Sequence, residues 1–230
     1  MYSSVTIDSG GFALAVGSGD EFACSEPREH GLADVISRPR WSHARTLALP
    51  GRCRGSVIAR WAENTRRHFG DAAVERLRAG LPAWARDLPD EPPEDAWFPV
   101  GIQLRLTELV IDELLGGEAS RLEPLLCEDV ARGVSRATGL FLRTVGPAPV
   151  LGRAKQIHPS LYDVGTVHAQ LTPGRASLHC ADAALFGHPT WSLLQLFAHR
   201  GFVELTGRRV AHLGLTTLGH DAARIDVAWS

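Results

Sequence analysis

The sequence predicts an α+β fold, in which an N-terminal helical half packs on a C-terminal antiparallel sheet built from two β-hairpins with an intervening helix. Two observations support this class. Apolar residues recur at helical spacing between about residues 55 and 162. In residues 166–180, and again in residues 208–230, apolar residues instead recur at every second position, as expected of half-buried strands.

The 230 residues are 44% hydrophobic, so the chain is long enough for one domain with an appendage. The net charge of −2 provides no basic field for a nucleic acid. Asp8 and the Gly10–Gly11 pair interrupt the early apolar run, and no segment approaches the ~20 apolar residues that cross a bilayer. We therefore expect no nucleic-acid partner, no membrane partner and a cytoplasmic location.

Residues 1–53 are expected to form an extension of uncertain order. Its first part alternates as in a short hairpin, at Val5, Ile7, Phe12, Leu14 and Val16, but no period is sustained after it. Residues 54–230 show the patterns of a single packed α+β domain. We therefore place the domain boundary at residue 53.

The helical half is expected to contain several amphipathic helices. The first carries Ile58, Trp61, Ala62 and Thr65 on one face and ends at Gly70. A longer helix follows Pro99 and is stopped by Gly116–Gly117. Its apolar stripe consists of Ile102, Leu106, Leu109, Val110 and Leu114. The same pattern recurs in residues 122–134, and shorter helical stretches lie near 139–145 and 150–162.

The sheet half begins with an amphipathic hairpin. Centring its turn on Pro173–Gly174 places His168 opposite His179. A helix then starts at Pro189 and directs Trp191, Leu194, Phe197 and Ala198 inward. In the closing hairpin, the residues expected to face the core are Ala211, Leu213, Leu215, Ile225, Val227 and Trp229.

No complete catalytic set is present in the sequence. The glycine-rich stretch at residues 9–19 lacks the lysine of a phosphate-binding loop and the context of a dinucleotide fingerprint. No GxSxG or HExxH motif occurs. The four cysteines have no zinc-site spacing. We therefore lean towards a protein that is not an enzyme, and no cofactor is predicted.

Aromatic residues give the candidates for a ligand pocket: Trp97, Phe98, Tyr162 and Trp191. Trp97 and Phe98 stand directly before an apolar helix. In that position they can fix the incoming chain against the first turn, as core anchors, or they can line a pocket for a small apolar molecule. Both roles stay open at this point.

Histidine is concentrated in the sheet half, where seven of the ten histidines lie between His158 and His220. As cross-strand neighbours, His168 and His179 would have Cβ atoms about 5 Å apart, close enough to share a divalent metal. His212 could join them. The alternative is that all three are half-exposed polar residues on the outer face of the sheet.

Four segments of the chain, taken in order, resemble an uncharacterised domain family that is expanded as paralogues in myxobacteria. Its members have about 180 residues, a typical size for a single domain. The segments are residues 55–70 with 75–84, then 97–117, 162–180 and 199–229, and they include the Trp97–Phe98–Pro99 step and the closing Trp229. That family is in turn similar to haem-NO-binding and vinyl-reductase-like ligand domains. The resemblance implies a helical-then-sheet ligand domain over residues 54–229.

Two signatures of those ligand domains are missing from this chain. The haem-binding branch carries a Tyr-x-Ser-x-Arg clamp for the propionates, but Tyr162 is followed by Asp163, Val164, Gly165 and Thr166. The metal-associated cysteine cluster of the vinyl-reductase-like branch is also absent, since the matching region holds only Cys127 and Cys180. The resemblance therefore does not imply that this chain binds haem or zinc.

From these observations we expect a non-enzymatic sensory or regulatory domain that binds a small apolar ligand or a protein partner. The alternative is a metal-binding enzyme or metal sensor that uses His168, His179 and His212. A purely structural homodimer is a third possibility. Metal content and mass in solution separate the three.

Overall fold

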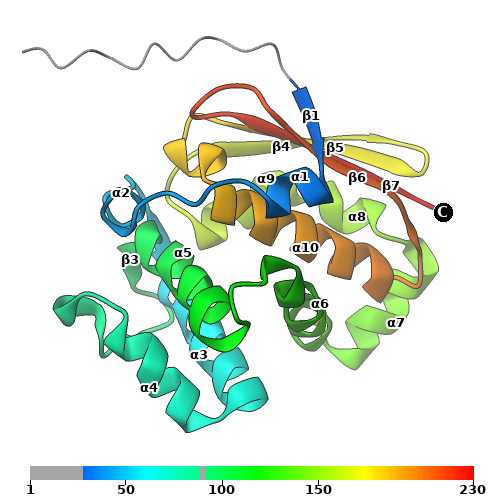
Figure 1. The fold of residues 1–230 in the computed structure, drawn as a ribbon. Helices are drawn as coiled ribbons and strands as arrows, with labels where there is room; N and C mark the ends of the chain where they lie inside the picture. The colour runs from blue at the N-terminus through cyan, green and yellow to red at the C-terminus, as the bar shows by residue number, and fades with distance from the viewer. Residues whose placement is uncertain (1–27, 89–91) are drawn as a thin grey trace, which may run out of the picture.

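A computed structural model of the protein describes residues 28–88 and 92–230. The short hairpin expected near residues 5–16 lies outside these ranges. The described chain forms a helical half and a five-stranded antiparallel sheet, which confirms the α+β class (Figure 1). No described helix combines the length and the apolar character needed to cross a membrane.

The two predicted hairpins form the sheet. Strands β4 (Thr166–Thr172) and β5 (Arg175–Ala181) make the first, and β6 (Val210–Thr217) and β7 (Ala223–Trp229) make the second. The strand order is β1-β6-β7-β5-β4. Thr172 pairs with Arg175 and His168 with His179, so the register predicted from the Pro173–Gly174 turn is confirmed. Gly174 has φ +72°, a conformation that glycine adopts without strain.

The segment expected to be an extension supplies the fifth strand. Strand β1 (Arg28–Gly31) pairs with the edge strand β6, and α1 (Leu32–Ile36) and α2 (His43–Leu47) follow it. Val35, Leu49 and Cys53 are buried in the main hydrophobic core. The described residues before residue 53 therefore share one hydrophobic core with the described residues after it.

The helical half is assembled from α3 (Gly55–Phe69), α4 (Asp71–Ala79), α5 (Val100–Leu109), α6 (Leu122–Arg132) and α7 (Arg136–Val145). The four residues predicted to face inward from α3 are buried, and Gly70 ends that helix. After α5 the chain continues as a π-helical turn, Val110–Leu114, and stops before Gly116–Gly117 as expected. The stretch predicted near 150–162 is two helices, α8 (Ala148–Leu151) and α9 (Ala154–Leu161).

Helix α5 is buried on every side, although its sequence predicts one apolar stripe. It lies against α2, α3 and α10, so Gln103, Arg105, Thr107 and Glu108 are buried with the apolar residues. A Cβ atom at Gly101 would stand 2.3 Å from the carbonyl oxygen of Thr46. Glycine at this position therefore permits the close approach of α2 to α5.

Helix α10 (Pro189–Leu205) lies beneath the sheet and packs against β6, β7 and α6 (Figure 1). Trp191, Leu194 and Phe197 are buried, as predicted for the inward face of this helix, whereas Ala198 is half-buried. In the closing hairpin the predicted inward residues are also buried, except for Ala211, which is exposed, and Trp229, which is half-buried. A register shift between Val210 and His212 displaces Ala211 from the regular alternation.

Candidate ligand cavity

A cavity of about 500 Å³ lies between the helical half and the inner face of the sheet. Helices α3, α5, α6, α8, α9 and α10 and strands β4, β5 and β7 each contribute to its lining. Most of the lining is apolar and includes Trp61, Leu126, Leu161, Leu178, Leu194 and Ile225. The volume falls within the range of about 300–1,000 Å³ that is usual for small-molecule sites.

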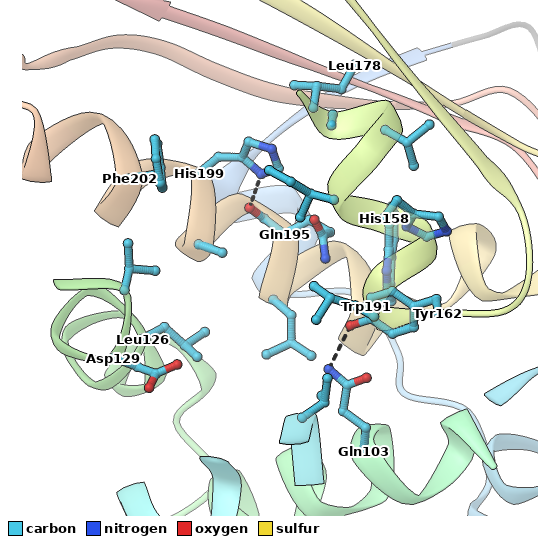
Figure 2. Close-up of a pocket in the computed structure, with 18 of the residues that line it drawn as sticks. Gln103, Leu126, Asp129, His158, Tyr162, Leu178, Trp191, Gln195, His199 and Phe202 are labelled. Atoms are coloured by element: carbon cyan, nitrogen blue, oxygen red, sulfur yellow. Dashed lines mark hydrogen bonds between the residues drawn. The ribbon is translucent and has the colours of Figure 1, made fainter. Parts of the chain in front are cut away.

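Three polar side chains gather at one end of this cavity (Figure 2). Nε2 of Gln103 donates a hydrogen bond to the Tyr162 hydroxyl oxygen over 3.0 Å. Burial raises the pKa of Tyr162 far above its ordinary value, so the hydroxyl is neutral. Oε1 of Gln103 and Nε1 of Trp191 are buried and have no hydrogen-bond partner in the described structure.

His158 forms the wall beside Tyr162. Its ring stacks on the Tyr162 ring at a centroid distance of 5.2 Å, and its Nε2 bonds to the carbonyl oxygen of Val164 over 2.8 Å. Because only an N–H can donate to a carbonyl, Nε2 carries the proton. Burial lowers the pKa of His158, so the imidazole is neutral near pH 7. Phe186, which is fully buried and is not a lining residue, packs against Trp191 with 4.9 Å between the ring centroids.

His199 lies elsewhere in the cavity wall, on α10 (Figure 2). Its Nδ1 donates to the backbone carbonyl of Gln195, one turn earlier, over 2.6 Å. That bond fixes the tautomer and leaves Nε2 as the basic nitrogen. Burial lowers the pKa of His199, which keeps the ring neutral. His199, which the sequence did not single out as a site residue, therefore belongs to the cavity wall.

Charge is confined to the mouth of the cavity. The charged lining residues are Arg60 and Asp129, with Arg60 Nη1 3.7 Å from Asp129 Oδ2 and the Arg60 side chain 53% exposed. The Cys180 thiol also lines the cavity, and burial raises its pKa to about 12, so it is uncharged at neutral pH. The interior therefore offers apolar surface and neutral polar groups.

The four aromatic candidates separate into two pairs. Tyr162 and Trp191 line the cavity. Trp97 and Phe98 do not line the cavity. They belong to the two-stranded ribbon formed by β2 (Arg52–Arg54) and β3 (Trp97–Pro99). The Arg54 guanidinium carbon lies 4.3 Å from the centre of the Trp97 ring, and Phe98 packs against the core. This arrangement suits the anchoring role that the sequence left open.

The three candidate metal ligands do not converge. His168 and His179 are direct cross-strand partners on β4 and β5. His212 lies on β6, on the far side of β7, and its Nε2 is 2.7 Å from Glu29 Oε1. Within residues 28–88 and 92–230, no group of three histidine, cysteine or carboxylate side chains is arranged to hold a metal ion.

Solved structures of H-NOX proteins superpose on most of the chain. An unliganded Fe(II) H-NOX protein from K. algicida matches with a TM-score of 0.54 at 10% identity, over 77% of this chain and 96% of its own. The chain has the fold of H-NOX domains. An S. oneidensis H-NOX protein in the Fe(II)NO state matches with a TM-score of 0.53 at 10% identity, over 77% of this chain and 99% of its own.

A third structure, from work on heme redox potential and porphyrin distortion, matches with a TM-score of 0.51 at 10% identity, over 76% of this chain and 99% of its own. The sequence matches no protein-family model and no curated protein. At this identity the likeness concerns the fold alone. It confirms the part of the sequence resemblance that pointed to a haem-NO-binding-like architecture.

Proposed function

We propose that the protein is a sensory domain that encloses a small, mainly apolar molecule in the cavity between its helices and its sheet. The observation that carries this proposal is the cavity itself, at about 500 Å³. Burial of apolar ligand surface against such a lining contributes roughly 25 cal/mol per Å². A ligand of modest size can therefore bind without any charged contact.

The neutral interior favours a binding role over catalysis. Cys180 holds its proton, His158 is tied to a backbone carbonyl, and His199 is tied to Gln195. Nucleophilic catalysis needs a nucleophile within hydrogen-bond reach of a base, and among the described residues of the cavity wall no hydrogen bond joins the Cys180 thiol to a histidine. We further propose that the chain belongs to the family expanded as paralogues in myxobacteria that its sequence resembles. The cytoplasmic location expected from the sequence stays a prediction.

Haem is a second candidate for the same cavity, and one observation favours it. His199 has the state required of an axial ligand: a neutral ring, Nδ1–H held by a carbonyl, and a basic Nε2. Bound haem would supply an iron able to hold a diatomic gas. The propionates are less well served, because Arg60 is the basic side chain at the mouth and it already faces Asp129. We therefore rank an organic ligand first.

A titration with an anilinonaphthalene fluorescent probe tests the proposed cavity. The wild type is expected to bind one probe with enhanced emission. Ala198→Phe adds a ring to the cavity wall on α10 and should abolish binding. Ala72→Phe makes the same change on the exposed face of α4 and should bind normally. Equal binding by both variants would place the probe outside the cavity and contradict the proposal.

Absorption spectroscopy tests haem separately. If haem occupies the cavity, addition of hemin to the apoprotein should shift the Soret band of free hemin, and this shift should be altered or lost in His199→Ala and kept in His158→Ala. An identical spectrum for wild type and His199→Ala would exclude His199 as an axial ligand.

A further inference from the structure

The two edge strands of the five-stranded sheet differ in length and in charge. Strand β1 has four residues and carries Arg28 and Glu29. Strand β4, Thr166–Thr172, has seven residues and contains no charged residue and no proline. It pairs with β5 at all seven positions without a register shift. Because sheet edges are usually protected by charge, proline, a bulge or short length, β1 has such protection and β4 lacks it.

The free edge of β4 presents the backbone groups of Val167, Ala169 and Leu171. In a two-residue hairpin the pair that closes the turn, here Thr172 and Arg175, is hydrogen-bonded, and bonded pairs alternate with non-bonded pairs along the strands. The N–H and C=O groups of the three intervening residues therefore point away from β5. Within residues 28–88 and 92–230, no hydrogen bond from another segment reaches them.

The sequence of β4, Thr-Val-His-Ala-Gln-Leu-Thr, has the same order of residue types in both directions. When two copies are placed antiparallel about Ala169, threonine lies opposite threonine, valine opposite leucine, and histidine opposite glutamine. Val167 of one copy would cover Leu171 of the other, whose side chain is 43% exposed in the single chain. No like charges would meet. Such cross-strand pairs stabilise antiparallel strands, so the edge of β4 is complementary to itself.

We propose that β4 is the contact surface for a second copy of this chain, with the two β4 strands antiparallel about Ala169 and the two sheets joined into one. The outward N–H and C=O groups of Val167, Ala169 and Leu171 would then all be paired across the symmetry axis. The contact is isologous, as in most homodimers. Val167 also lines the cavity, so the joined edges adjoin the ligand cavity of each copy.

Sedimentation equilibrium of the untagged full-length chain tests the association. The wild type is expected to show a reversible equilibrium between 24.9 kDa and twice that mass at micromolar concentrations, because a contact through one strand is small and small contacts are transient. A wild type that stays monomeric would contradict the proposal. If a chain that begins at residue 28 then dimerises, residues 1–27 occupy the edge in place of a second copy, and the proposal is wrong.

Two matched double variants test whether the association uses this edge. His168 and Gln170 are exposed, and each would lie opposite the other across the axis. His168→Lys with Gln170→Lys places lysine opposite lysine twice and should raise the dissociation constant at least about tenfold. His168→Glu with Gln170→Lys places glutamate opposite lysine twice and should dimerise at least as tightly as the wild type. Equal dissociation constants for the two variants would mean that the copies meet elsewhere.

Thiol cross-linking tests the antiparallel register. His168→Cys protein mixed with Gln170→Cys protein should form a disulfide-linked dimer under mild oxidation, because opposed Cβ atoms lie about 5 Å apart. Each protein alone should cross-link less, since identical positions lie diagonally across the axis. Wild type under the same conditions is the control for the natural cysteines. Equal cross-linking in the mixture and in the separate samples would overturn the pairing about Ala169.

Discussion

His188 Nε2 lies 3.0 Å from Thr46 Oγ1, and both side chains are completely buried. Nδ1 of His188 accepts from the backbone N–H of Thr190 over 3.1 Å, so Nε2 carries the proton and donates to Thr46. Thr46 belongs to α2, and His188 caps the start of α10. This one hydrogen bond therefore joins the N-terminal segment to the helix that supports the cavity.

Removal of residues 1–50 is expected to destabilise the domain. It deletes β1, the buried Val35 and Leu49, and the Thr46 partner of His188. Each large buried side chain contributes on the order of 2 kcal/mol or more. Thermal unfolding checks this, with a chain that begins at residue 28 as the control because it keeps every described contact. Full stability of the shorter chain would instead support an autonomous domain from residue 54, as the sequence suggested.

Acid is expected to destabilise the protein through His188. Burial lowers the pKa of His188 to about 4, whereas an exposed histidine titrates near 6.5. Between these values the unfolded chain binds the proton that the folded chain excludes. Stability is therefore complete above about pH 6.5 and falls towards pH 4, by up to roughly 1.4 kcal/mol per pH unit.

His188→Asn isolates this effect, because asparagine can also cap α10 but does not titrate. Denaturant unfolding at several pH values should show a smaller loss for the variant than for the wild type in this window. The neutralised His158 and His199 remain in both proteins and cancel in the difference. Glu108, whose pKa burial raises, lies 4.0 Å from His188 Nε2, so part of the measured difference reports the coupling of these two groups. Identical pH profiles would show that His188 does not control the loss.

Gly165→Ala should disrupt the packing of Phe186, whose ring contacts the cavity residue Trp191. The position has φ +74°, and a Cβ atom there would stand 2.5 Å from two ring atoms of Phe186. Gly117→Ala is the control, since φ is +82° with open space around it. We expect a loss of about 1 kcal/mol for the control, and at least 1–3 kcal/mol more for Gly165→Ala from overpacking. Equal losses measured by chemical denaturation would mean that Phe186 moves aside freely.

Sequence periodicity predicted what is local in this fold. The Pro173–Gly174 turn and the alternation around it determine which residues face each other, so the His168–His179 pairing could be derived. Strand β1 could not, because its four residues, Arg28–Gly31, have no apolar alternation and owe their conformation to the distant β6. Because residues 28–31 have no apolar alternation of their own, the sequence predicts a domain boundary at residue 53 and not one before β1.

The cavity was predicted only in part. Tyr162 and Trp191 could be named as aromatic candidates, but Gln103 and His199 could not. Gln103 sits on a helix whose polar residues look solvent-facing until α2, α3 and α10 cover it. His199 bonds to the backbone carbonyl of Gln195 one turn earlier, and this local contact does not reveal from the sequence that the residue lines a cavity. Their convergence depends on long-range packing that periodicity does not encode.

Zinc is expected to leave the melting temperature unchanged. His168 and His179 are neighbours, but His212 is held by Glu29 beyond β7, and two imidazoles seldom make a tight site. Melting curves with and without micromolar zinc check this, alongside a His168→Ala, His179→Ala variant. A rise in the wild type that the variant abolishes would revive the metal-binding alternative.

Native mass spectrometry of the untagged protein, as isolated, tests the central claim most directly, because it reports ligand, metal and stoichiometry together. We expect a non-covalent adduct with the mass of one small organic molecule. It should persist in Ala72→Phe and disappear in Ala198→Phe, which fills the cavity. An adduct that survives in Ala198→Phe, or wild-type protein that carries none and does not bind the anilinonaphthalene probe, would contradict a ligand site between the helices and the sheet.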